Sequence, residues 1–176
     1  MEVERVRTYK LLGVIISDDL KRNAHVEYGI AKAAKRLYAL RLLKRTGVMP
    51  KDVLKLYLCN VRSVLEYAAQ VWQDIPAYLS DAIESTQRRA LKIILPNASY
   101  QQALGLTNMT SLANRRILLY KKLMADMRNK SHPISFLAPQ ITTRAIPYQL
   151  RSGSTTVLKT MKRTKRADYF FTFRFA

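Results

Sequence analysis

Helical periodicity, interrupted at fixed points by proline and glycine, constrains the fold of this chain more than any other feature. Between residues 24 and 129, apolar side chains recur three and four positions apart, the spacing that places them on one side of an α-helix. Gly47 suits the end of a first helix, and Pro50 suits the first turn of a second. Pro76 and Pro96 bound a third. The expected fold is mainly α, a helical bundle.

Five helices are expected, at about residues 24–46, 50–74, 77–95, 99–105 and 110–129. The second has the broadest apolar arc, so we expect it at the centre of the bundle, with Trp72 buried near its end. Arg62 and Glu66 are spaced for an ion pair along it. Ser99 is the expected N-cap of the short fourth helix. Leu112, Leu119, Leu123 and Met127 form the expected apolar stripe of the fifth.

Residues 1–19 are predicted to form a β-hairpin ahead of the bundle. The β-branched run Leu11–Ile16 is typical of a strand buried on both faces, and Gly13 inside it indicates a bulge or a close backbone approach. Residues 20–130 then form the bundle, and residues 131–176 a poorly ordered basic C-terminal arm. That arm carries the basic run Lys159–Arg166 and ends in the aromatic segment Phe170–Phe175.

The charge of the chain predicts a polyanionic partner. It has 31 Lys and Arg residues against 12 Asp and Glu, a formal net charge of +19. Such a surplus destabilises a compact fold by self-repulsion unless a partner neutralises it. Nucleic acid is the leading expectation, followed by an anionic membrane surface and then by an acidic protein.

Several classes of protein are excluded by composition. No apolar stretch approaches the length of a membrane span, and the N-terminus lacks the layout of a signal peptide. A single cysteine cannot form an internal disulfide. We therefore expect a nuclear or cytoplasmic protein, in a reducing compartment, that is neither secreted nor membrane-bound. No glycine-rich phosphate loop occurs.

Three groups of residues resemble catalytic or metal sites, and each has a plainer interpretation. Asp18-Asp19 resembles a two-metal carboxylate pair but lacks a third carboxylate, so a turn with a helix-capping aspartate is expected. His25, Glu27 and His132 match the ligand types of a non-haem iron site, but His25 and Glu27 would diverge at a helix start. Cys59 is expected to be a small core residue. No catalytic residue, metal site or cofactor is predicted.

Basic clusters on the expected helices are the better candidates for a functional surface. They lie opposite apolar stripes, and phosphate neutralisation grows with the number of cations. The candidate nucleic-acid-binding residues are Lys32, Lys35, Arg36, Arg88, Arg89, Lys92, Arg115 and Arg116.

A family resemblance rests on short motifs in a consistent order. These are Tyr9-Lys10-Leu11-Leu12-Gly13-Val14, Asp19-Leu20, His25-Val26, Arg62-Ser63-Val64-Leu65-Glu66-Tyr67-Ala68, Gln87-Arg88-Arg89-Ala90-Leu91-Lys92 and Arg115-Arg116. Over about residues 5–130 the chain resembles the region after the catalytic palm in reverse transcriptases of non-LTR (LINE-type) retrotransposons.

This resemblance implies a function. Leu11, Leu12 and Gly13 would correspond to the primer-grip hairpin, and the helices to the thumb and its extension. The implied partner is the backbone of an RNA or DNA primer–template, together with the palm and fingers region of the same element. The family's catalytic aspartates precede the Leu-Gly segment and have no counterpart here. The chain is therefore expected to be a non-catalytic fragment of an RNA-directed DNA polymerase, inactive in isolation.

Two other interpretations stay open. Residues 10–44 also resemble the N-terminal domain of an alkylated-DNA-repair AlkB homologue. That domain occurs in 2-oxoglutarate dioxygenases and tRNA methyltransferases, which implies an accessory domain of such an enzyme. The third alternative is a helical interaction module without a nucleic-acid role.

Overall fold

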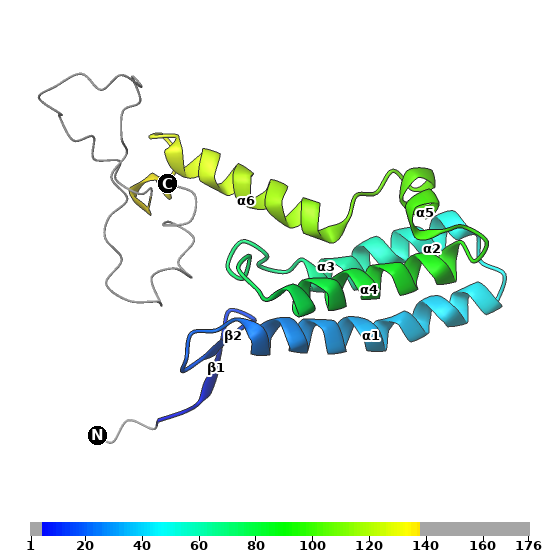
Figure 1. Ribbon diagram of the computed structural model, residues 1–176, viewed down its shortest axis with the longest axis horizontal. Coiled ribbons are helices and arrows are strands. Elements are labelled where there is room, and N and C mark those ends of the chain that lie inside the picture. Colours follow the sequence, from blue (N-terminus) through cyan, green and yellow to red (C-terminus); the bar gives the residue numbers. More distant parts are fainter. Residues whose placement is uncertain (1–4, 138–176) are drawn as a thin grey trace, which may run out of the picture. The chain divides into compact units, whose positions relative to one another are not determined.

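The computed structural model describes the chain from residue 5 to residue 137. The chain divides into two compact units, residues 1–120 and residues 121–176. The basic run Lys159–Arg166 and the aromatic segment Phe170–Phe175 lie outside the described residues. Within those residues the fold is mainly α and begins with an antiparallel β-hairpin, which confirms the expected fold class (Figure 1).

The hairpin consists of β1 (Thr8–Leu11) and β2 (Val14–Ser17), paired so that the first residue of one strand lies opposite the last of the other. Positive φ angles at Leu12 (46°) and Gly13 (83°) give the loop the backbone of a type I′ turn. All of β1 is exposed and β2 is largely half-buried. The expectation of a strand buried on both faces is therefore wrong, because the turn folds the apolar run back on itself outside the core.

The helical elements follow in chain order. They are α1 (Asn23–Arg45), α2 (Pro50–Leu56), the π-helical η1 (Tyr57–Arg62), α3 (Ser63–Leu65), α4 (Ala77–Ile94), α5 (Tyr100–Leu106), α6 (Leu112–Arg128) and the 3₁₀ turn η2 (Ser135–Leu137).

Helix boundaries agree with the predicted caps. Gly47 has a φ of 81°, the left-handed conformation expected just beyond a helix end, and Pro50 is the first residue of α2. Pro76 immediately precedes α4. Ser99 caps α5 in a capping box, in which its hydroxyl accepts from the Gln102 amide and the Gln102 side chain accepts from the Ser99 amide. The sequence therefore identified these boundaries correctly.

The predicted helix over residues 50–74 is wrong beyond Leu65, where α3 ends. Ala68 has a φ of 51°, a left-handed conformation that turns the chain out of the helix. Trp72 reaches the core from this turn, where it is 2% exposed, and its indole Nε1 donates to the Tyr67 carbonyl oxygen at 2.7 Å. The predicted burial of Trp72 is confirmed, but it lies on a turn.

The π-helical turn has a cause in the spacing of the core residues. Four positions spaced by four residues are all buried: Val53, Tyr57, Val61 and Leu65. On a straight α-helix this spacing would drift by about 40° at each step, or about 120° in all, and would leave the buried side. The wider i→i+5 turn of η1 rotates the chain less per residue, so that it offsets this drift and keeps the four side chains on the buried side.

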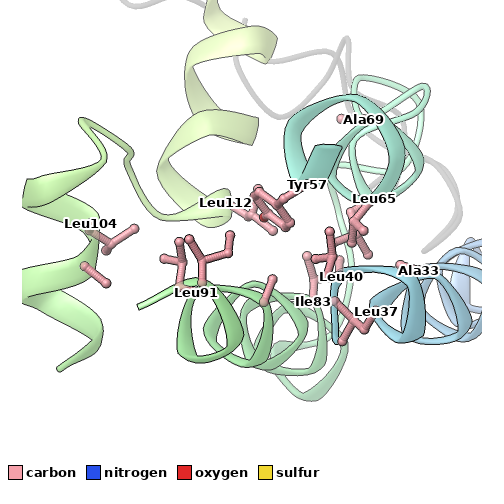
Figure 2. Close-up of a cluster of buried hydrophobic side chains, with 14 of the residues drawn as sticks. Ala33, Leu37, Leu40, Tyr57, Leu65, Ala69, Ile83, Leu91, Leu104 and Leu112 are labelled. Atoms are coloured by element: carbon pink, nitrogen blue, oxygen red, sulfur yellow. The ribbon is translucent and has the colours of Figure 1, made fainter. Parts of the chain in front are cut away.

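Helices α1 and α4 run parallel and side by side (Figure 1). The Asn23 side-chain amide donates to the Tyr78 hydroxyl oxygen at 3.5 Å where both helices begin, and Lys44 Nζ donates to the Ile94 carbonyl at 3.4 Å where both end. The segment from α2 to α3 runs antiparallel to them. Figure 2 shows buried side chains contributed by α1, by the segment from α2 to Ala69, and by α4, α5 and α6; those labelled are Ala33, Leu37, Leu40, Tyr57, Leu65, Ala69, Ile83, Leu91, Leu104 and Leu112.

A buried polar chain also crosses this core. The Tyr57 hydroxyl donates to Gln87 Oε1 at 2.8 Å, and Gln87 Nε2 donates to the Tyr100 hydroxyl oxygen at 2.9 Å. Tyr100 in turn donates to the Glu84 carboxylate, whose other oxygen accepts from the Leu112 amide at 3.0 Å. Burial raises the pKa of Tyr57, and burial with the Glu84 hydrogen bond raises the pKa of Tyr100 to about 12. Both hydroxyls therefore remain protonated donors.

Candidate nucleic-acid interface

The primer-grip-like residues form the exposed end of the hairpin. Leu12 is 85% exposed, and Leu11 is exposed beside it. Gly13 lies against the ring of Tyr67, where a Cβ would come within 3.1 Å of the ring, and the Tyr67 hydroxyl donates to the Leu12 carbonyl at 2.7 Å. The predicted close approach at Gly13 is confirmed. The hairpin is thus attached to the segment after α3 by this hydrogen bond, and both the positive φ and the nearby ring favour glycine at position 13.

His25 attaches the other side of the hairpin to α1. Its Nδ1 accepts from the Ile15 amide of β2 at 3.3 Å, and the side chain is buried. Burial lowers the pKa of His25, while a hydrogen bond with the Tyr67 carbonyl opposes that shift. A neutral ring engaged in this way holds the fold together.

The remaining candidate metal ligands either accept hydrogen bonds from nearby backbone or are exposed to solvent. His132 Nδ1 accepts from the Ile134 amide at 3.4 Å, and Glu27 is exposed. Asp19 accepts from the Ser17 hydroxyl at 2.6 Å and from the Lys21 amide at 3.0 Å, and these bonds lower its pKa to about 2. Asp19 therefore stabilises a turn. Among residues 5–137, no three His, Cys, Asp or Glu side chains are grouped closely enough to hold a metal ion.

Cys59 is not a core residue, contrary to the sequence expectation. It lies exposed on η1. Because the core positions of this segment are spaced by four, the residue midway between Tyr57 and Val61 points away from the interior.

The candidate cations of α1 lie beside the hairpin and η1. Lys32 Nζ is 5.8 Å from the ring centroid of Tyr28, and Lys10 of β1 approaches the same ring at 5.6 Å. Arg36 donates to the Asn60 carbonyl of η1, and Lys35 is exposed. The structure thus brings a cation of α1 together with one of the hairpin, which sequence reasoning missed. The i,i+4 spacing of Tyr28 and Lys32 was the available signal.

A pocket of about 330 Å³ opens where these elements meet. Its walls come from β1 and the hairpin turn, from the first half of α1, and from the segment after η1. The lining residues are Lys10, Gly13, His25, Tyr28, Gly29, Lys32, Ser63, Val64 and Tyr67. No carboxylate lines this pocket, so Lys10 and Lys32 set its charge.

The candidate cations of α4 have other neighbours. The Arg88 guanidinium lies 5.1 Å from the ring centroid of Tyr100 on α5, and Lys92 Nζ donates to the Pro96 carbonyl at 2.6 Å. Arg89 Nη2 donates to the Thr86 hydroxyl at 3.4 Å. All three are exposed. Their contacts run to α5 and to the end of α4, so the structure gives them no shared site with the hairpin.

Arg115 and Arg116 are the two candidates whose environment differs from the expectation. Arg115 Nε lies 2.5 Å from Glu66 Oε1, and Glu66 also pairs with Arg62 at 3.6 Å, which confirms the predicted Arg62–Glu66 pair. Arg116 is buried, with Nη2 donating to the Ser80 hydroxyl at 2.6 Å. The expectation that Arg116 lies opposite the apolar stripe is wrong.

The physical reason lies in the buried side of α6. The expected stripe includes Leu119 and Leu123, which are only half-buried. The buried positions are instead Leu112, Arg116, Tyr120, Met124 and Met127. Arg116 thus occupies a core row, one turn from Leu112 and one from Tyr120.

Comparisons with protein-family models, with curated proteins and with solved structures find no match for this chain. None of the helices in the described part of the chain combines the length and the apolar character needed to cross a membrane.

Proposed function

We propose that this protein binds nucleic acid along the phosphate backbone, as a thumb-like, non-catalytic part of a retrotransposon-type RNA-directed DNA polymerase. The single observation that carries the proposal is that the exposed cations on its helices have no carboxylate partner. Within residues 5–137, none of six predicted cations forms an ion pair with a carboxylate: Lys32, Lys35, Arg36, Arg88, Arg89 and Lys92. Exposed positive charge without local acid attracts a polyanion.

The α1 cations are the first candidates for contact with phosphate. Lys32 and Lys35 are exposed, and Arg36 bonds only to a backbone carbonyl. Each can exchange its present neighbour for a phosphate oxygen without leaving a buried carboxylate unpaired. Arg115 and Arg116 are omitted from the proposed surface, because one is paired with Glu66 and the other is buried.

The hairpin supports a second part of the proposal, contact with a palm-like partner region. Its exposed end carries large apolar side chains, with Leu12 85% and Tyr9 62% exposed. Leu12 also has a φ of 46°, which is costly for a side chain of this size. Strained, exposed apolar residues are more common at functional contacts than on inert surfaces. The resemblance to a primer-grip hairpin points in the same direction.

A salt titration tests the proposed function. Fluorescence anisotropy of a labelled primer–template is measured with the full chain over a range of salt concentrations. The triple variant Lys32→Ala, Lys35→Ala, Arg36→Ala should flatten the slope of log K against log salt by about 2–3, close to 0.9 for each lost phosphate contact.

The matched control is Lys51→Ala, Lys121→Ala, Lys122→Ala, which removes the same charge from exposed positions elsewhere. It should leave most of the slope in place. Equal slopes for the two triple variants would mean that net charge alone drives binding. No salt-dependent binding by the parent chain would reject the proposed function outright.

A further inference from the structure

The pocket between the hairpin and α1 contains two kinds of polar side chain. Three already form hydrogen bonds within the protein: Tyr67 donates to the Leu12 carbonyl, His25 accepts from the Ile15 amide, and Ser63 donates to the Cys59 carbonyl. The ammonium groups of Lys10 and Lys32 have no carboxylate partner in the described residues and lie over Tyr28. The pocket therefore offers two cations that both approach the ring of Tyr28, and no carboxylate.

The hydrogen bonds within the protein also join the segments that form the pocket walls. The Tyr67–Leu12 bond joins the segment after α3 to the hairpin turn, and the His25–Ile15 bond joins α1 to β2. The volume of about 330 Å³ is at the lower end of the range for small-ligand sites, which suits one nucleotide unit.

The charge of a phosphate at the end of a nucleic-acid strand matches two lysines better than the charge of an internal phosphate does. A terminal phosphate monoester carries close to two negative charges at neutral pH, because its second pKa is about 6. An internal phosphodiester carries one. Two ammonium groups without a neighbouring carboxylate can pair with both charges, and the exposed part of the Tyr28 ring provides a flat surface for the terminal sugar or base.

We propose that this pocket binds the terminal phosphate of a nucleic-acid strand, held by Lys10 and Lys32, with Tyr28 against the terminal nucleotide. The proposal rests on the proposed function, and it adds recognition of a strand end to binding along the backbone.

The experiment compares short single strands of one sequence that differ only at their ends. One has hydroxyls at both ends, one has a 5′-phosphate and one a 3′-phosphate. The full chain should bind at least one phosphorylated strand about tenfold more tightly than the hydroxyl strand. The double variant Lys10→Ala, Lys32→Ala should abolish this difference. The control Lys121→Ala, Lys122→Ala removes the same charge and should retain it.

A second readout locates the site. The amide NMR signals of Gly13 and Gly29, which line the pocket, should shift on adding a phosphorylated strand and stay in place with the hydroxyl strand. Inorganic phosphate at millimolar concentration should compete with the phosphorylated strand only. Signals that respond to inorganic phosphate but not to any phosphorylated end would overturn the proposal.

The outcomes separate the two proposals. If all three strands bind equally and with steep salt dependence, the strand-end site is rejected while backbone binding stands. If no strand binds, the proposed function fails as well.

Discussion

The guanidinium carbon of Arg116 lies 5.7 Å from the ring centroid of Trp72, in the interior of the helical unit. The two residues are 5% and 2% exposed. Burial lowers the pKa of Arg116, and the negative charges of Glu84 and Glu66 oppose that shift. This cation–π pair joins the first half of α6 to the turn that follows α3. An arginine in this position stabilises the fold and is not available to a phosphate.

The variant Arg116→Ala should therefore lower stability and should not specifically lower affinity. Loss of the cation leaves the Ser80 hydroxyl and one face of Trp72 without a partner, at a cost of about 1–3 kcal/mol. Lys122→Ala, at an exposed position of the same helix, should change stability by less than about 0.5 kcal/mol. Urea unfolding measures both. An Arg116→Ala protein as stable as the parent would contradict the structural role.

Trp72→Ala should cost about 3–5 kcal/mol, because a large side chain that is almost fully buried leaves a cavity. Trp72→Phe should cost less, since it fills most of the cavity and loses mainly the hydrogen bond from Nε1 to the Tyr67 carbonyl. The two free energies of unfolding, compared by urea titration, separate packing from hydrogen bonding. Similar losses for both variants would show that the hydrogen bond dominates.

Stability should fall between neutral and mildly acidic pH because of His25. Its pKa is lowered in the folded chain, whereas the unfolded residue titrates near 6.5. The unfolded state thus binds the proton more readily, so the contribution of His25 is complete above about pH 6.5 and declines as the pH falls toward the folded value. Asp19 titrates outside this window, since its contribution is lost only below about pH 4.

Urea unfolding at several pH values between 5 and 7.5 measures the effect. The variant His25→Gln should remove most of the pH dependence, at the expense of a lower stability at neutral pH. A parent protein with constant stability across this range would contradict the assignment.

Replacing Leu12 by Asn should stabilise the hairpin. A leucine at a φ of 46° is strained by roughly 1 kcal/mol, whereas Asn tolerates this conformation and Asn-Gly is the preferred type I′ sequence. The melting temperature should rise by about 2–4 °C. Leu11→Asn is the matched control, because Leu11 is also exposed but has no positive φ, and it should bring no gain. Equal effects of both substitutions would show that exposure, not backbone strain, matters.

Local signals in the sequence predicted most of the fold. Pro50 and Ser99 identify helix starts because their chemistry acts within one turn. The turn at Ala68 was not predicted, because alanine favours helix. The reason for the turn is tertiary: it returns the chain to the core, where Trp72 is buried and hydrogen-bonded. Periodicity could not reveal that Arg116 occupies a core row, because composition rules place arginine outside.

The candidate site was predictable only in part. Lys32 and Gly13 were each singled out by sequence, but their shared pocket depends on how the hairpin docks on α1. Lys10 belongs to a motif of the family resemblance but was not a predicted binding residue, and Tyr28 was not singled out at all, because a tyrosine on a helix has no specific functional signal. Their proximity is a property of the tertiary structure.

The wide turn of η1 amounts to one inserted residue, so deleting Asn60 would be expected to convert this segment into an ordinary α-helix. On an ordinary α-helix shortened by one residue, the core positions would fall within about 60° of one another; these are Val53, Tyr57, Val61 and Leu65. Asn60 is exposed, so its removal takes no side chain from the core. The Asn60 carbonyl, which now accepts from the Arg36 guanidinium, would be removed with it. A chain one residue shorter would keep its interior, while Arg36 of α1 would need another partner on this segment, so the length of the segment determines which of its carbonyls α1 contacts.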